Sequence, residues 1–204
     1  MPLSSKRVYF GDYVFVVDEN VYEPAEDSFL FAENLEVEAG ERVLDMGTGC
    51  GILGILAAQK ARGVIVVDVN PYAVRCAKEN AALNSVRGKM GFVQGDLFTW
   101  LSGKATFDVI LFNAPYLPAD ENEADSWIGR AWAGGATGRQ ILDRFIAEAP
   151  NHLKQTGRIL LMQSTLANVD ETLHRFAECH LNTRVVADSA LSFFETITLI
   201  EAKF

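Results

Sequence analysis

The sequence predicts an α/β protein with a mostly parallel sheet, and two patterns in its 204 residues support this prediction. From residue 41 onward, short apolar runs alternate with stretches of helical character. The runs are rich in Val, Ile and Leu without strict alternation, which is typical of strands covered on both faces. Near the end, residues 183–202 (TRVVADSALSFFETITLIEA) hold two strand-like runs with a short link. Such a link permits only antiparallel pairing, because a parallel crossover needs a dozen or more residues.

The elements can be justified in chain order. Residues 8–17 (VYFGDYVFVV) are aromatic and β-branched and predict one or two short strands. Pro24, followed by two acidic residues, marks the start of a helix. MGFV (90–93) predicts a short extra strand at an edge of the sheet. Core strands are expected at 42–46, 63–68, 107–112 and 157–163, with helices at 51–61, 71–84, 138–153 and 168–179.

Length and charge restrict the class of protein. A chain of 204 residues with 49% hydrophobic composition fits one domain, which we expect to cover 1–204. Its net charge of −9 argues against DNA or RNA as a direct partner. The sequence has no apolar run of the roughly 18 residues that span a bilayer, and its start lacks the apolar core of a signal peptide. Three widely spaced cysteines predict neither disulfides nor a metal site. We therefore expect a soluble, cytoplasmic protein.

A glycine-rich stretch, LDMGTGCGILG (44–54), follows the first predicted core strand and opens a helix. Its glycines allow the backbone to approach a ligand at the helix N-terminus. The stretch also satisfies the dinucleotide pattern GxGxxG, and Asp68 at the end of VIVVD suits a ribose diol in either cofactor class. A simple glycine turn with a solvated aspartate is the alternative that implies no function.

Two carboxylates favour S-adenosylmethionine over a nicotinamide nucleotide. Asp45 lies two residues before Gly47, where it would repel a pyrophosphate but suits the ammonium group of a methionine moiety. VQGDLF places Asp96 after the third strand, where it can accept a hydrogen bond from the adenine amine while Leu97 covers the ring. With Asp68, three acidic strand ends suit an uncharged adenosine and a cationic sulfonium.

The stretch FNAPYLP (112–118) leaves the fourth predicted core strand at the edge where ligands of such sheets bind. A planar NH₂ group, as in an amide or an adenine amine, is a poor nucleophile because its lone pair is delocalised. Two acceptors can hold its N–H bonds: the side-chain oxygen of Asn113 and the carbonyl of Ala114, which Pro115 biases towards an extended conformation. Tyr116 offers an aromatic face. This pattern predicts catalysis by positioning, without a strong base. Taken alone, an Asn-Pro turn with a core tyrosine would explain it too.

A parallel sheet that ends in an antiparallel hairpin is the outline of class I methyltransferases with a Rossmann-like fold and a seven-stranded sheet. Within that class the chain resembles the HemK-type glutamine methyltransferases of translation release factors, in their short eukaryotic and archaeal form. The match runs over nearly the whole chain. It rests on VYEPAEDS (21–28), Asp45–Gly51, Asp68-Val-Asn-Pro, Gly95-Asp96-Leu97, Asn113–Tyr116, WAGGATGRQILDRF (132–145) and Phe194-Glu195-Thr196.

The resemblance implies methylation of the glutamine side-chain amide in the Gly-Gly-Gln motif of a class I release factor, a step linked to translation termination. It implies S-adenosylmethionine as the cofactor, with residues 1–40 forming strands and a helix that cover its site. Ala114 stands where the family usually has Pro, and either residue can supply a backbone carbonyl. The implied cofactor contacts are Ser28, Asp45, Gly47, Asp68, Asp96, Leu97 and Asn113. The implied substrate contacts are Asn113, Ala114, Pro115 and Tyr116, with Asn113, Pro115 and Tyr116 as the catalytic group.

Three alternatives remain open. Adenine amino methylation of DNA or RNA uses a similar motif, but the charge of −9 and the lack of a target-recognition domain count against it. Protein lysine methylation requires deprotonation of an amine and gains little from a clamp for a planar amide. A cofactor-binding module without catalysis is the third, and the intact Asp45, Asp68, Asp96 and Asn113 argue against it.

Two further segments suggest protein partners. The short type works with a small zinc-binding activator protein, so the resemblance implies a heterodimer. Independently, Met90 and Phe92 would place apolar side chains on one face of an edge strand, which invites an added strand or a cover from the same chain. The loop 117–136 is rich in acidic residues, and it is either a solvated surface or a rim that suits a basic protein segment. Its acidic residues are Asp120, Glu121, Glu123 and Asp125.

Overall fold

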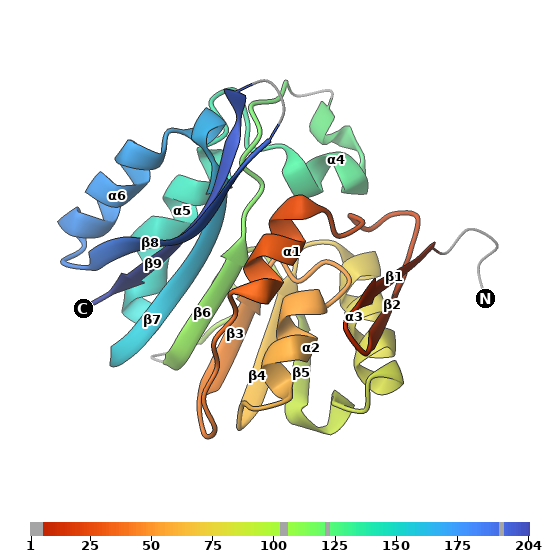
Figure 1. Cartoon of the computed structure of the whole chain (residues 1–204). Helices are drawn as coiled ribbons and strands as arrows, with labels where there is room; N and C mark the ends of the chain where they lie inside the picture. Colours follow the sequence, from red (N-terminus) through yellow and green to blue (C-terminus); the bar gives the residue numbers. More distant parts are fainter. Residues whose placement is uncertain (1–5, 103–105, 121–122, 192–193) are drawn as a thin grey trace.

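A seven-stranded sheet forms the centre of the computed structural model, which describes residues 6–102, 106–120, 123–191 and 194–204 (Figure 1). Five neighbouring strands of this sheet are parallel, while the last strand of the chain runs antiparallel to both of its neighbours. This arrangement confirms the predicted α/β class, with a mostly parallel sheet and an antiparallel C-terminal hairpin. In spatial order the strands are β5 (Met90–Gln94), β4 (Gly63–Asp68), β3 (Arg42–Met46), β6 (Phe107–Asn113), β7 (Leu153–Ser164), β9 (Thr196–Lys203) and β8 (Asn182–Ala190).

Helices cover both faces of the sheet (Figure 1). Helices α1 (Glu26–Glu33) and α2 (Ile52–Ala58) lie on one face, and α5 (Gln140–Glu148) lies on the other with α6 (Val169–Glu178) packed beside it. The other helices described are α3 (Pro71–Leu83) and α4 (Trp127–Trp132), with 3₁₀ turns η1 (Arg87–Lys89), η2 (Glu123–Asp125), η3 (Ala149–His152) and η4 (Thr165–Ala167).

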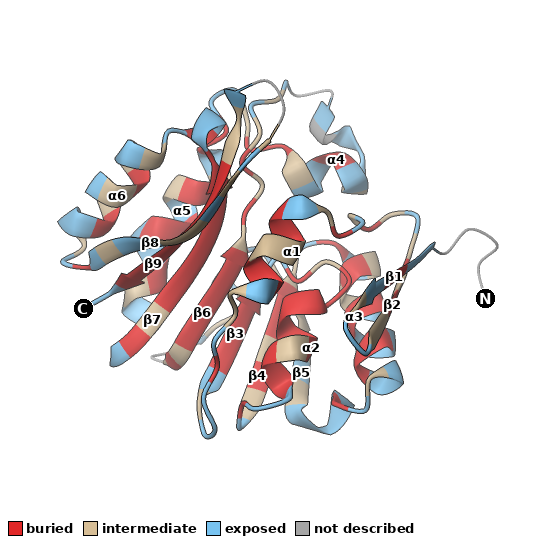
Figure 2. Cartoon of the chain, in the orientation of Figure 1, coloured by how far each residue is buried: buried red, intermediate tan, exposed pale blue. Residues whose placement is uncertain are grey.

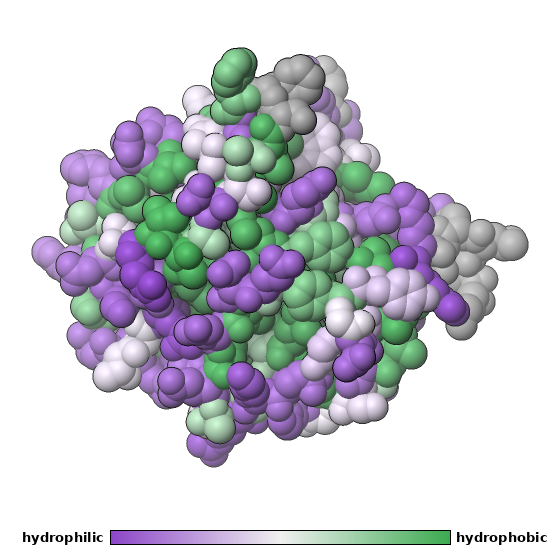
Figure 3. All heavy atoms as spheres, viewed as in Figure 1, coloured by the Kyte–Doolittle hydropathy of each residue, from purple (hydrophilic) through white to green (hydrophobic). Residues whose placement is uncertain are grey.

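The central strands are buried along most of their length (Figure 2). In β6 the four residues from Val109 to Phe112 are all buried, although their side chains point to alternate faces. Burial on both faces explains why the strand sequences lack a polar period. On the face of the molecule seen in Figure 3, hydrophilic side chains lie around and between the exposed apolar groups.

The N-terminal segment forms a separate antiparallel hairpin, β1 (Lys6–Phe10) and β2 (Tyr13–Val17), beside α3. Two asparagines one turn apart bind its backbone: Asn80 lies on α3, and Asn84 caps the C-terminal end of that helix. Asn84 Oδ1 accepts from the N–H of Val14 at 3.2 Å, and Asn80 Oδ1 accepts from the N–H of Val16 at 2.9 Å. Both side-chain amides also donate to the carbonyls of the same two valines. The two amides therefore act as a strand-like partner that fixes the hairpin against the helix.

The predicted end of the helix over 138–153 is wrong. The helix expected over 138–153 ends at Glu148, followed by the 3₁₀ turn η3 and by β7, which begins at Leu153. Pro150 lies in the first positions of η3 and has no backbone N–H to continue an α-helix. The edge position of MGFV is confirmed, since β5 pairs only with β4 among the strands that the structure describes.

Candidate active site

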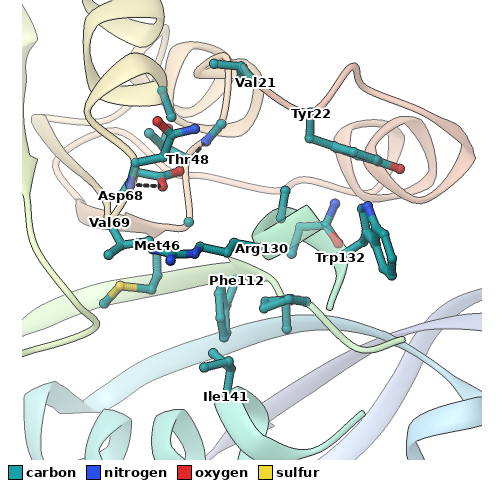
Figure 4. A pocket seen from close by; sticks show the side chains of 18 of the residues that line it. Val21, Tyr22, Met46, Thr48, Asp68, Val69, Phe112, Arg130, Trp132 and Ile141 are labelled. Carbon is teal, nitrogen blue, oxygen red and sulfur yellow. Dashed lines mark hydrogen bonds between the residues drawn. The ribbon is translucent and has the colours of Figure 1, made fainter. Parts of the chain in front are cut away.

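A cavity of about 640 Å³ opens beside the carboxyl ends of β3, β4 and β6 (Figure 4). Its wall is built by the segment before α1, the glycine-rich loop after β3, the segments that follow β4, β5 and β6, and parts of α4 and α5. Open α/β sheets bind their ligands at this edge, and the volume lies within the roughly 300–1,000 Å³ usual for small-molecule sites.

The backbone of the glycine-rich loop, which forms part of this wall, packs closely against neighbouring residues. Gly47 has a φ of +64°, and a Cβ on it would lie 3.1 Å from the Phe112 ring. Gly51 has a φ of +91°, and a Cβ there would lie 3.0 Å from Ala77 on α3. At these two positions the loop needs both a left-handed backbone and the absence of a side chain.

Asp45 lies behind the loop and not on the cavity wall. Its Oδ2 accepts from Thr48 Oγ1 at 2.6 Å and from the N–H of Gly54 at 2.9 Å. Burial raises the pKa of this carboxyl to about 7, and the two hydrogen bonds offset only part of that effect. In this arrangement Asp45 supports the start of α2 and the turn at Thr48. Its direct contact with an ammonium group stays a prediction.

Asp68 ends β4 and does line the cavity. Its Oδ2 accepts from the N–H of Gly49, and its Oδ1 from the N–H of Asn70, each at 2.9 Å. Burial raises the pKa of the carboxyl, while these backbone donors act in the opposite direction. Figure 4 shows Asp68 beside Thr48 at one end of the cavity, away from Tyr22 and Trp132. The carboxylate is held rigidly with lone pairs left for a ligand.

Asp96 and Leu97 follow β5 and also line the cavity. Asp96 Oδ2 accepts from Arg144 Nη2 at 2.7 Å, in a pair whose side chains are 48% and 43% exposed. Because the pair is exposed, it orients the carboxylate more than it stabilises the fold. Leu97 is buried and has a φ of +48°, so its side chain is held in an uncommon backbone conformation at the wall.

Asn113 ends β6, and its side chain is tied to α1. Its Nδ2 donates to Asp27 Oδ2 at 3.1 Å and to Ser28 Oγ at 3.3 Å. Tyr116 Oη also donates to Asp27 Oδ2, at 3.2 Å. Residues 85 to 89 positions apart in the chain thus share one hydrogen-bond network, which is at least partly buried. Asn113 Oδ1 is buried and has no hydrogen-bond partner among the described residues.

The segment after Asn113 is clamped by the loop that follows α4. Leu117 pairs with Ala133 in a single parallel bridge, with hydrogen bonds of 2.9 and 2.8 Å on its two sides. Gly138 has a φ of +73°, and its backbone lies so close to the carbonyl of Tyr116 that a Cβ would meet that oxygen. Buried Arg139 donates to the carbonyls of Ala167 and Asn168. The loop 134–139 therefore fixes the position of the Tyr116 backbone.

The structure brings most of the expected site residues to one cavity wall. Those that line it are Ser28, Gly47, Asp68, Asp96, Leu97, Asn113, Ala114, Pro115 and Tyr116. Trp127 and Trp132 line it as well, so the acidic loop does lie beside the site, although Glu121 lies outside the described residues.

Sequence reasoning missed Tyr22 and Asp27 as site residues. Both line the cavity, and their side chains are hydrogen-bonded to each other. The available signal was VYEPAEDS, in which Asp27 could be interpreted only as a charge at a helix start.

Among the residues that the structure describes, no group of three or more His, Cys, Asp or Glu side chains could hold a metal ion. Within the same residues, no helix is long and apolar enough to cross a bilayer.

Known protein families match this architecture. Residues 15–129 match the model of the methyltransferase small domain. The chain belongs to this methyltransferase family. It is 45% identical to a candidate protein N5-glutamine methyltransferase of Methanocaldococcus jannaschii, over 88% of this chain and 90% of that protein. It is 36% identical to methyltransferase HEMK2 of Mus musculus, over 74% and 75% of the two chains.

More distant relatives show the same relationship. A release factor glutamine methyltransferase of Deinococcus radiodurans is 39% identical over 65% of this chain, which spans 49% of that longer protein. Among solved structures, the E. cuniculi Mtq2–Trm112 complex, described as responsible for methylation of the eRF1 termination factor, matches with a TM-score of 0.70 at 24% identity. That match covers 90% of this methyltransferase and 98% of the solved chain. At this identity it supports the fold alone.

Proposed function

We propose that the protein transfers a methyl group from S-adenosylmethionine to the side-chain amide nitrogen of glutamine in the Gly-Gly-Gln segment of a class I release factor. The observation that carries this proposal is the buried, unpartnered Oδ1 of Asn113 at the cavity wall, next to Pro115 and Tyr116. A buried acceptor without a donor costs about 1–3 kcal/mol, and an N–H of a substrate amide would relieve that cost.

The cavity suits the cofactor by its chemistry. Asp68 and Asp96 place carboxylates on the wall where a ribose diol and an adenine amine can be bound, and Leu97 adds an apolar surface. The glycine-rich loop and Ser28 complete this end. When bound, S-adenosylmethionine supplies an electrophilic methyl group whose carrier leaves as a neutral thioether.

The remaining part of the wall orients the amide. Asn113 Oδ1 accepts one N–H of the substrate, and the carbonyl of Ala114 accepts the other. Tyr116 packs its ring against the planar group, with its backbone fixed by Gly138. Held in this way, the amide nitrogen presents one face to the methyl group. The rate enhancement comes from orientation and preorganised acceptors, and not from a strong base.

The function can be tested by methyl transfer from labelled S-adenosylmethionine to three acceptors: a class I release factor, its Gln-to-Ala variant, and duplex DNA. We expect labelling of the first alone, with N5-methylglutamine found in its Gly-Gly-Gln peptide. Label in DNA but not in the release factor would overturn the proposal. Label on a lysine of the release factor would assign the chemistry to an amine and not to an amide.

The protein is further proposed to act with a small zinc-binding activator subunit that adds to the free edge of β5. Two features support this. The Mtq2 structure is that of a complex with Trm112, and β5 exposes Gly91 and leaves Met90 and Phe92 half-buried. A strand added at this edge would satisfy the unpaired backbone and cover both apolar side chains. Phe92→Asp should abolish co-purification with the activator, whereas Gln94→Asp, an exposed change two residues along the same strand, should not. Retention of the activator by Phe92→Asp would exclude this edge.

A further inference from the structure

Asp27 connects nearly every polar group at the substrate end of the cavity. It lies in the first turn of α1 and is 7% exposed. Its Oδ1 accepts from Ser28 N at 2.6 Å, Ser28 Oγ at 3.1 Å and Tyr22 Oη at 3.3 Å. Its Oδ2 accepts from Asn113 Nδ2 at 3.1 Å and from Tyr116 Oη at 3.2 Å. Among the described residues, no basic side chain forms an ion pair with it.

This carboxylate determines which end of the Asn113 side chain can face a substrate. The side-chain amide has a donor end and an acceptor end of nearly equal size. An acceptor-only carboxylate accepts a hydrogen bond from Nδ2 but would repel Oδ1. With Nδ2 directed to Asp27 and Ser28, Oδ1 is left without a partner among the described residues. The rotated amide would instead offer N–H bonds to a substrate that also brings N–H bonds.

We propose that Asp27 is a positioning residue that fixes the Asn113 amide with its oxygen directed to the substrate NH₂ group, and so makes the site select an amide donor. This inference rests on the proposed glutamine methylation for its activity measurements. Its geometric part, the fixed orientation of Asn113, is independent of the substrate.

The hydroxyl groups around Asp27 strengthen the arrangement. Tyr22 and Tyr116 both donate to the same carboxylate. Burial and the charge of Asp27 raise the pKa of both phenols, so they remain protonated donors. With its acceptor sites directed at these groups, the carboxylate remains oriented towards Asn113.

The first two variants each change one of the two polar side chains, Asp27 or Asn113. In Asp27→Asn an amide NH₂ would meet Asn113 Nδ2 or the tyrosine hydroxyls, so we expect Asn113 to rotate and turnover on the release factor to fall about 100-fold. The Kd for S-adenosylhomocysteine should change by no more than a few-fold. In Asn113→Asp alone, two carboxylates would face each other across 3.1 Å, and turnover should fall as well.

Restoring complementarity should restore activity. In the double variant Asp27→Asn/Asn113→Asp, the new amide donates to the new carboxylate, which again offers an oxygen to the substrate. Turnover should exceed that of either single variant by about tenfold or more, because the coupling of contacting residues is non-additive. A role of Asp27 limited to fold stability would give no such recovery. Glu26→Gln is the matched control: it removes an exposed carboxylate from the same helical turn and should leave turnover unchanged.

A second measurement follows the orientation of Asn113 without any reaction. In ¹⁵N-labelled protein, the Asn113 side-chain NH₂ signals are assigned by their loss in Asn113→Asp. Their hydrogens should exchange slowly in the wild type and at least tenfold faster in Asp27→Asn. Equal exchange in the two proteins, wild-type-like turnover of Asp27→Asn, or a double variant no better than the single ones would each overturn the inference. If the wild type does not label the release factor, the proposed function fails, and the exchange measurement alone judges Asp27.

Discussion

The side-chain amide of Asn80 donates a hydrogen bond to the backbone carbonyl of Cys50 at 2.8 Å. The same buried side chain accepts from the N–H of Val16 and donates to its carbonyl. One residue of α3 therefore joins the glycine-rich loop to the N-terminal hairpin. Through it, the order of the hairpin and the shape of the cofactor end of the cavity are linked.

Asn80→Ala should affect stability and cofactor binding together. It leaves the buried Cys50 carbonyl without its side-chain donor, which costs about 1–3 kcal/mol of unfolding free energy. We expect the Kd for S-adenosylhomocysteine to rise about threefold to tenfold, since the loop loses one of its anchors. Urea unfolding and calorimetric titration measure the two effects.

Asn84→Ala is the matched control, because Asn84 binds the same hairpin one helical turn away without touching the loop. It should lower the unfolding free energy while leaving the Kd close to that of the wild type. Equal losses of cofactor affinity in the two variants would show that the hairpin as a whole, and not the bond to Cys50, shapes the loop.

Gly138→Ala should impair turnover through the backbone of Tyr116. A Cβ at this position would meet the Tyr116 carbonyl and would also sit at a φ of +73°. Because the carbonyl must move, the ring and the neighbouring amide acceptors move with it, and we expect kcat to fall about tenfold or more.

Gly11→Ala is the control for Gly138→Ala, because it separates the backbone cost of a positive φ from the steric contact of an added Cβ. Gly11 has a φ of +54° with nothing within 4 Å of an added Cβ. It should therefore show only the backbone cost of about 1–2 kcal/mol, with kcat unchanged. A Gly138→Ala enzyme with full kcat and lowered stability would mean that the position of the Tyr116 carbonyl is not critical for transfer.

The central strands of the sheet could be predicted because the apolar sequence of each one indicates its burial. The six residues FDVILF are mostly apolar, which is enough by itself to predict a buried strand, and the structure confirms this strand as β6. The site depends on contacts between distant segments. Asp27 meets Asn113 across 86 positions of sequence, and no local pattern in either segment indicates that α1 places its first turn there.

For Asp45 the position in the fold could be predicted, but the direction of its side chain could not. Its place at the end of β3, beside the glycines, was clear from the sequence. The direction of its side chain was not, because a strand residue can face either the ligand or the adjacent helix. Hydrogen bonds from Thr48 in the loop and from the N–H of Gly54 in α2 direct it towards α2.

Asn113→Ala and Asp68→Ala should have opposite effects. Asn113→Ala removes the acceptor that positions the nucleophile, so turnover should fall about 100-fold or more while cofactor affinity stays within a few-fold. Asp68→Ala removes a carboxylate at the cofactor end and should weaken binding by about 1–3 kcal/mol, with a smaller change in kcat at saturation. Single-turnover kinetics and calorimetry measure these quantities. If both variants lost affinity equally, Asn113 would have to be reassigned as chiefly a cofactor contact.

The raised pKa of Asp45 makes stability depend on pH. Burial raises this pKa from 3.8 to about 7 in the folded protein. Between these values the unfolded chain has lost the proton that the folded protein retains. The contribution of Asp45 to the unfolding free energy therefore becomes less favourable as pH rises from about 4 to about 7, by as much as about 4 kcal/mol for the full shift.

Asp45→Asn should remove this dependence. Both donors bind the same oxygen, Oδ2, so an asparagine oxygen can accept from Thr48 and Gly54 while its NH₂ carries no charge. Urea unfolding of both proteins from pH 4.5 to 7.5 should show the variant gaining stability relative to the wild type as pH rises. Asp108→Asn is the control with the opposite sign. Its burial is outweighed by hydrogen bonds from Lys154 and from the N–H of Arg42, so the pKa of Asp108 is lowered and its contribution is lost only as pH falls below about 4. If the wild type and Asp45→Asn gave parallel curves over this range, Asp45 would already be ionised in the folded protein at pH 4.5.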